Sequence, residues 1–302
     1  MNARSSAAPD RLPALVVFVS AAFWGIYWLP QRALVEAGLD GGWATLGQFA
    51  LAALLLAPAI LWRLARGRPS GLGAPLGTFC IGAGLVLYAN SLLFTSVAHA
   101  LLLFYLAPAW GTLFELVGQR RGLTIVRTAA LAMSMAGLWI VVGLDTGMPW
   151  PTALGDWMGL AAGLMLTFGQ FRLRMRPAGD DLGLLFSMLA GGSLAAAAFI
   201  VFRGDALGVA PSTQRFIAAL PWLVLVTLLF QLGGNVGLMW GATRLDAGRF
   251  AILILSDVVV GVASAALLTD EPFGWREAVG WLLIVGAGLL ELAAPRKAEA
   301  TP

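Results

Sequence analysis

Long stretches without any charged side chain dominate the pattern of this chain. They cover residues 12–31, 41–62, 69–114, 182–202 and 216–243. The first has 20 residues, which as a helix spans the roughly 30 Å hydrocarbon core of a bilayer. The third has 46 residues, too many for one crossing and enough for two. The pattern predicts an all-α, polytopic membrane protein and excludes both a soluble enzyme and a protein with a single anchor.

We predict ten transmembrane helices, which places both termini on the same side of the membrane. They cover 13–33, 43–64, 75–95, 98–118, 124–143, 155–175, 182–202, 216–241, 247–268 and 275–294. If the N-terminus is cytoplasmic, fifteen of the 19 Lys and Arg residues lie at cytoplasmic span ends and four at outer ends. Because positive charge concentrates on the cytoplasmic side of membrane proteins, we predict cytoplasmic N- and C-termini. This topology also explains the pI of about 9.6 without a nucleic-acid partner.

Composition narrows the chemistry further. Apolar residues make up 59% of the chain and charged residues 12%, against about 45–50% and 25% in soluble domains. One cysteine and one histidine build neither a zinc site nor more than a single Cys–His pair. The chain also lacks the GxxxxGK[ST] motif of ATPases. We therefore expect no catalytic residues, no metal and no cofactor, which disfavours an intramembrane enzyme.

Two segments of the chain, 98–143 and 249–294, resemble each other. A shift of 151 residues aligns Gly137 with Gly288. The sequence thus predicts two halves, 1–150 and 151–302, with five spans each. Because five is odd, the second half should be inverted in the membrane relative to the first.

Loop charge supports the inversion independently. The turn at 119–121 is basic, whereas the corresponding turn at 270–271 is acidic, as expected for copies on opposite sides of the membrane. Inverted repeats are typical of secondary transporters, whose substrate site lies between the halves. Ancestral duplication in a structural membrane protein is the alternative interpretation.

Short motifs resemble the drug/metabolite transporter superfamily, with two EamA-type repeats over residues 13–294. They are Phe23-Trp24-Gly25, Leu106-Ala107-Pro108, Gly155-Asp156 and Asp270-Glu271-Pro272. The segments Phe104–Pro108 and Gly234–Gly237 further resemble the YddG-type aromatic amino-acid exporter branch. The resemblance implies export of amino acids or other small metabolites across the bacterial inner membrane, without ATP.

Polar side chains recur at helical spacing in the first, third, fourth, sixth, eighth and ninth spans. A polar group facing hydrocarbon is costly, so such faces turn toward protein or water. These six spans are predicted to enclose a central cavity, and the second, fifth, seventh and tenth to be peripheral. The candidate substrate-binding residues are Trp24, Trp28, Tyr88, Tyr105, Gln170, Gln231 and Asn235.

Asp257 interrupts an otherwise charge-free run from residue 250 to 269. A carboxylate at that depth costs several kcal/mol unless it is paired, protonated or hydrated. Coupling to a proton or a cation is one interpretation, and a structural hydrogen bond to a neighbouring helix is the other. Pro108 should break the fourth span at the cavity, because it cannot donate to the carbonyl of Phe104. Glu115 is expected near the cytoplasmic interface.

Together these patterns predict an alternating-access exporter of amino acids or similar small amphipathic metabolites. Its partners would be a small-molecule substrate and the lipid bilayer, and a monomer is compatible with the sequence. Export of drugs, nucleosides or other metabolites is the alternative within the same class. A non-transporting multispan scaffold is the alternative outside it.

Overall fold

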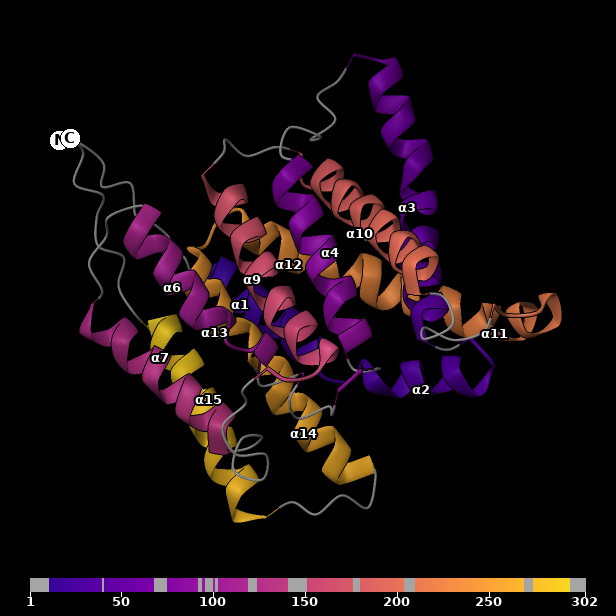
Figure 1. Ribbon diagram of the computed structural model, residues 1–302. Helices are drawn as coiled ribbons and strands as arrows, with labels where there is room; N and C mark the ends of the chain where they lie inside the picture. Colours follow the sequence, from indigo (N-terminus) through magenta and orange to yellow (C-terminus); the bar gives the residue numbers. More distant parts are fainter. Residues whose placement is uncertain are drawn as a thin grey trace.

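The computed structural model describes residues 11–39, 41–67, 75–91, 94–95, 100, 103–118, 124–140, 151–175, 180–203, 210–268 and 274–293. Every regular element in these ranges is a helix, which confirms the predicted all-α class there (Figure 1). The helices are α1 (Arg11–Trp24), α2 (Trp28–Glu36), α3 (Gly41–Ala65), α4 (Pro75–Ser91), α6 (Ala107–Gly118), α7 (Ile125–Leu138), α9 (Leu154–Arg174), α10 (Asp181–Arg203), α11 (Thr213–Val226), the π-helix η3 (Thr227–Gly234), α12 (Asn235–Ala242), α13 (Ala247–Ile254), α14 (Ser256–Leu268) and α15 (Trp275–Ala293).

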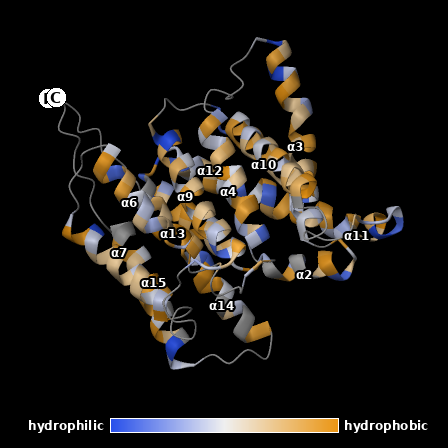
Figure 2. Cartoon of the chain, viewed as in Figure 1, coloured by the Kyte–Doolittle hydropathy of each residue, from blue (hydrophilic) through white to orange (hydrophobic). Residues whose placement is uncertain are grey.

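Three helical stretches are long and apolar enough to cross a membrane. They are α3, α10 over Asp181–Phe202, and the continuous run from α11 through η3 to α12. Their outer faces expose large apolar side chains such as Leu54, Val201 and Trp222, and hydrophobic colour covers much of their length in Figure 2. In water such surfaces would be unfavourable, whereas a bilayer accommodates them.

Each predicted span overlaps a described helix, but the first and ninth are not the continuous helices that the sequence predicts. In the first, residues 25–27 form a turn in which the Gly25 amide bonds to the Ala22 carbonyl at 3.1 Å. In the ninth, Leu255 separates α13 from α14. In the fourth, a turn at Tyr105 and Leu106 precedes α6. Pro108 therefore lies in the first turn of α6, where its missing N–H is tolerated.

The helices pack in a regular set of pairs. α3 lies on α10, α6 on α13, and α7 on α15, and the last pair runs side by side along one edge of the bundle (Figure 1). α4 lies on α9, and α1 on α12 and α14. Glycines allow the backbones to approach closely, since a methyl group added at Gly169 would lie 2.5 Å from the Gly77 carbonyl oxygen. The main apolar core contains Tyr105 and Leu255, which lie at the breaks of the fourth and ninth spans, whereas Ile26 and Tyr27 pack on a second apolar cluster.

Candidate functional site

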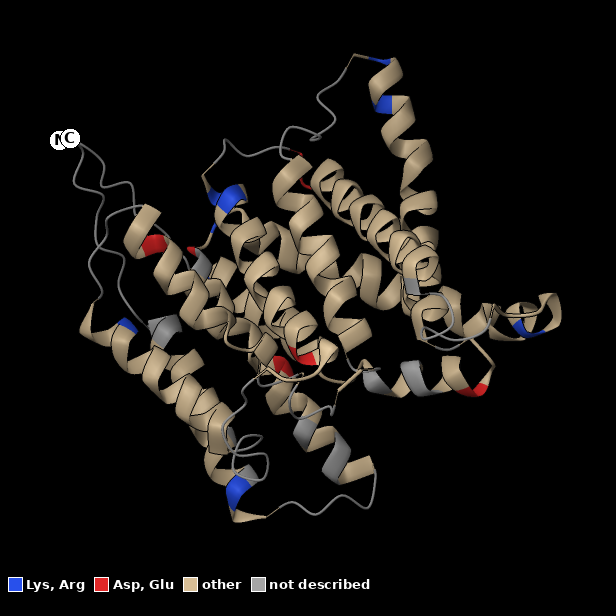
Figure 3. Cartoon of the chain, viewed as in Figure 1, with Lys and Arg blue, Asp and Glu red and all other residues tan. Residues whose placement is uncertain are grey.

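Asp257 lies in the first turn of α14, directly after the break at Leu255. Figure 3 shows acidic colour where α14 begins, in the middle of the bundle, whereas the basic positions lie at helix ends. The hydroxyl of Tyr105 donates a hydrogen bond to Oδ2 of Asp257. The other carboxylate oxygen, Oδ1, is buried and has no hydrogen-bond partner. The positive end of the α14 dipole favours a negative charge at this position.

The breaks in three spans meet at this carboxylate. Tyr105 belongs to the turn before α6, and Asp257 follows the turn between α13 and α14. Gly25, in the turn after α1, packs on the same place: an added methyl group would lie 2.5 Å from the backbone carbonyl oxygen of Asp257. Such an approach is open only to glycine, which has no Cβ.

Two of the three tyrosines of the chain, Tyr88 and Tyr105, lie near Asp257. Tyr88 stacks on Phe104 with ring centroids 4.2 Å apart, and Phe104 meets Tyr105 edge-on at 5.0 Å. The charge of Asp257 acts on the Tyr88 hydroxyl, as does the hydroxyl of Tyr27. The structure thus brings together Tyr88, Tyr105 and Asp257, which come from three different spans.

A second aromatic group adjoins the turn at residues 25–27. The ring of Phe230, on η3, lies 4.6 Å from Phe23, 5.1 Å from Tyr27 and 5.7 Å from Trp24. The indole nitrogen of Trp24 is buried without a hydrogen-bond partner and faces the backbone of Gly234, where an added methyl group would lie 2.7 Å away. The side chain of Trp28 lies outside the described residues.

Amide side chains form a buried chain beside these rings. The Tyr27 hydroxyl donates to Oε1 of Gln48, and Nε2 of Gln231 donates to the same oxygen at 3.2 Å. Nδ2 of Asn235 then donates to Oε1 of Gln231 at 3.1 Å. Gln231 and Asn235 therefore already have protein partners. The π-helix supports this arrangement, because Gln231 lies within it and Asn235 directly follows it; π-helical turns occur frequently at functional sites.

Gln48 belongs to this buried chain of polar side chains, but the helical periodicity of the sequence does not predict it. It lies on α3, within a span predicted to be peripheral, and its side chain is fully buried. A lone amide makes no stripe along its helix, so periodicity does not single it out. It is nevertheless the only amide in the charge-free stretch 41–62, and the cost of a polar group in hydrocarbon identifies it.

Gln170 lies apart from the tyrosine cluster in the contacts that the structure describes. It is buried on α9, two turns beyond Gly163, whose added methyl group would lie 2.4 Å from the carbonyl oxygen of Phe104. Its Nε2 has no hydrogen-bond partner. A role for Gln170 in binding remains a prediction.

Asp156 has a structural role at the start of α9. Its Oδ2 accepts from the backbone amides of Thr152 and Ala153, both at 2.9 Å, and its Oδ1 from the hydroxyl of Thr95 at 2.5 Å. The carboxylate thereby caps α9 and ties it to the segment after α4. The Gly155-Asp156 motif is explained by this junction, because a methyl group at Gly155 would lie 2.7 Å from Ser91 and Phe94 backbone atoms.

Replacing Asp156 with alanine should destabilise the fold by about 3 kcal/mol, since it leaves several buried donors unpaired at about 1–3 kcal/mol each. Asp156→Asn keeps one oxygen for the amides of Thr152 and Ala153, and its NH2 group then donates to the Thr95 hydroxyl. The main loss is the charge at the helix N-terminus, which costs about 1 kcal/mol. Thermal unfolding in detergent measures both values. Equal melting temperatures for the alanine variant and the wild type would contradict the capping role.

Glu115 is buried inside the protein and paired there, and its position near the cytoplasmic interface stays a prediction. Its Oε2 pairs with Nη1 of Arg127 on α7 at 2.7 Å, and its Oε1 accepts from the Gly248 amide at the start of α13, also at 2.7 Å. Only 5% of Glu115 is exposed. The carboxylate thus joins three helices, α6, α7 and α13, and its partner on another helix explains why it can be buried.

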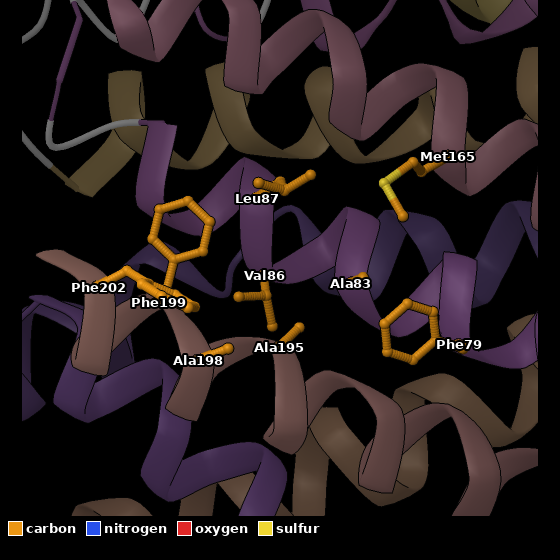
Figure 4. A pocket seen from close by; sticks show the side chains of 9 residues that line it. All are labelled: Phe79, Ala83, Val86, Leu87, Met165, Ala195, Ala198, Phe199 and Phe202. Atoms are coloured by element: carbon orange, nitrogen blue, oxygen red, sulfur yellow. The ribbon is translucent and has the colours of Figure 1, made fainter.

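One cavity in the described structure lies apart from the predicted central one. It measures about 340 Å³ and lies between α4, α9 and α10 (Figure 4). Its walls are entirely apolar, with Phe79, Met165 and Phe199 among the nine lining residues. None of the candidate binding residues lines it, and α10 belongs to a span predicted to be peripheral. Among the described residues, no group of three His, Cys, Asp or Glu is placed to hold a metal ion.

Comparisons with known proteins agree with this architecture. Residues 11–143 match the sequence profile of the EamA-like transporter family, a family of transporters and not of enzymes. No curated protein sequence matches the chain. A solved structure titled only "Crystal structure of protein" superposes with a TM-score of 0.68 and 20% identity, over 92% of this chain and 95% of that one. At that identity the likeness concerns the fold alone.

Proposed function

We propose that this chain is a secondary transporter that exports amino acids or similar small amphipathic metabolites by alternating access. The observation that carries the proposal is the meeting of three interrupted spans at one carboxylate. In secondary transporters, discontinuous helices form the substrate and coupling-ion sites near the membrane midplane. The match of residues 11–143 to a transporter family supports the same conclusion.

The helix pairs also support two inverted halves, 1–150 and 151–302. If each span of the first half corresponds to the span five places later, then α3 and α10, α6 and α13, and α7 and α15 are corresponding pairs, and each pair is in contact. The contact of α4 with α9 corresponds to that of α12 with α1, and both occur. The breaks before α6 and α14 correspond as well. A pseudo-two-fold axis between the halves predicts this pattern.

The substrate class, the location and the orientation extend this proposal. Aromatic rings beside hydrogen-bonding groups suit an amphipathic molecule, and the resemblance to the aromatic amino-acid exporter branch points to amino acids. We place the chain in the bacterial inner membrane with both termini cytoplasmic, on the distribution of Lys and Arg. Trp24, Tyr88 and Tyr105 would bind the substrate, and Asp257 would couple transport to a proton or cation.

Counterflow in proteoliposomes tests the function. Vesicles preloaded with a mixed amino-acid pool should accumulate labelled amino acid from outside, and unlabelled analogues should compete. Counterflow of drugs or nucleosides instead would move the proposal to the alternative substrates. Failure of every compound, with protein of normal melting temperature, would leave the scaffold interpretation.

Replacing Asp257 with asparagine should remove the dependence of transport on the pH gradient if this carboxylate carries the proton. Asparagine keeps the size and the hydrogen bond to Tyr105 but neither binds nor releases a proton. Initial uptake rates with and without a gradient, for wild type and Asp257→Asn, measure the effect. A variant that transports and responds to the gradient like the wild type would contradict the coupling role.

A further inference from the structure

The charges around Asp257 determine what the site can bind, and the inference drawn from them rests on the transport function proposed above. Among the described residues, no Lys or Arg forms an ion pair with Asp257; the ion pairs described there hold Asp180, Asp181, Asp246 and Glu115 instead. The Tyr105 hydroxyl donates to the Asp257 carboxylate, and the N-terminus of α14 contributes its dipole. When Asp257 is ionised, its negative charge therefore has no counter-ion among the residues that the structure describes.

One oxygen of this carboxylate is buried without a donor. Oδ2 accepts from Tyr105, whereas Oδ1 has no hydrogen-bond partner. Ionised carboxylates form their strongest hydrogen bonds with charged donors such as an ammonium group. Of the described titratable groups, Tyr105 contacts Asp257, and Tyr88 lies beyond Tyr105 on the far side of the Phe104 ring. Both are neutral donors, so neither neutralises the carboxylate.

Among the described residues, no cation beside Asp257 offers a substrate carboxylate a comparable charged partner. The Tyr27 hydroxyl, Nε2 of Gln231 and Nδ2 of Asn235 each already donate to a protein oxygen. The unpartnered indole nitrogen of Trp24 faces the backbone of Gly234. When the ammonium group of an amino acid pairs with Asp257, its carboxylate would thus be buried nearby without a cationic partner, and an unpaired charge beside another of the same sign costs several kcal/mol.

The aromatic rings beside Asp257 also favour a positively charged ligand. Tyr88, Phe104 and Tyr105 form a continuous aromatic surface that ends at Asp257. The faces of aromatic rings attract cations through their quadrupoles. An ammonium group held by Asp257 would therefore lie beside aromatic rings, and the apolar body of the same molecule would pack on them.

We infer that the site recognises the ammonium group of its substrate and selects a monocationic amine with an aromatic or apolar body over the zwitterionic amino acid with the same body. The carboxylate of Asp257 is the counter-ion, and the aromatic surface is the platform for the body. Amino acids with the same side chain are then weaker ligands, because their carboxylate must be buried unpaired.

Three compounds that share a phenyl ring and a two-carbon spacer isolate the charge. Phenethylamine is a cation, phenylalanine a zwitterion and 3-phenylpropionate an anion. Calorimetric titration of the purified full chain in detergent at neutral pH should show phenethylamine binding at least about tenfold more tightly than phenylalanine. The anion should bind most weakly.

Substitutions distinguish the effect of removing the Asp257 charge from the effect of disturbing the fold. Asp257→Asn should lose the preference for the amine, whereas Asp257→Glu and Tyr105→Phe, which both keep a carboxylate, should retain it. Melting temperatures report whether each variant folds. Phenylalanine binding as tightly as phenethylamine to the wild type would overturn the inference, as would a folded Asp257→Asn that keeps the full preference for the amine.

Counterflow distinguishes failure of this inference from failure of the transport function. Exchange of amino acids or other metabolites without any advantage for amines would overturn the inference and leave the transporter proposal intact. No binding of the three compounds and no exchange of any solute would overturn both.

Discussion

Replacing Gly25 with alanine should lower the initial rate of transport about 100-fold, the loss expected when a working site is displaced by about 1 Å. The new methyl group would lie 2.5 Å from the carbonyl oxygen of Asp257, 2.7 Å from Cβ of Val260 and 2.8 Å from the amide of Gly261. Two of these neighbours are backbone atoms, which cannot rotate away. The turn after α1 must therefore separate from α14, and Asp257 would lose its position relative to Tyr105.

Gly261→Ala is the matched control, because it lies on the other side of the same contact. Its added methyl group would meet only the Gly25 carbonyl oxygen, at an ordinary distance of 3.5 Å. Alanine also favours the helical conformation by about 1 kcal/mol relative to glycine. Counterflow rates of the two variants, at equal amounts of folded protein, make the comparison. Similar rates for both would show that the close approach of Gly25 to Asp257 is dispensable.

The sequence predicts those parts of the site that a single helix reveals. Asp257 stands out because a charge within an apolar run is costly wherever the run packs. Tyr88 and Tyr105 stand out because each lies on a polar face of its own span. The structure adds that Asp257, Tyr88 and Tyr105 lie close together, which the spacing of residues along a single helix cannot predict.

Helix breaks and buried polar residues that depend on contacts with other helices cannot be predicted from the sequence of a single span. No proline marks the break at Leu255. Pro30 leaves the Ile26 carbonyl without its helical donor, but it does not show that the turn at residues 25–27 fits against the backbone of Asp257 on α14. The sequence pattern shows no partner for Glu115, because Arg127 and Gly248 lie on other helices and contact it only in the folded structure. Gln48 is missed for the same reason, since its partners Tyr27 and Gln231 come from other spans.

The carboxylate of Glu115 should be the most costly buried ion to remove from this fold. Replacing one partner of a buried ion pair typically destabilises a protein by about 3–5 kcal/mol, because the other charge is left uncompensated. Glu115→Ala leaves both Arg127 and the Gly248 amide without their acceptor. We expect a loss at the upper end of this range, measured as thermal or denaturant unfolding in detergent.

Arg127→Ala should cost less, because Glu115 then still accepts the hydrogen bond from Gly248 at the N-terminus of α13, where the helix dipole favours its charge. The double variant should be less destabilised than the sum of the two single ones, since neither charge is then left buried alone. Glu115→Gln keeps an acceptor for Gly248 and should fall between wild type and Glu115→Ala. Additive losses, or a larger loss for Arg127→Ala than for Glu115→Ala, would contradict a carboxylate that links α6, α7 and α13.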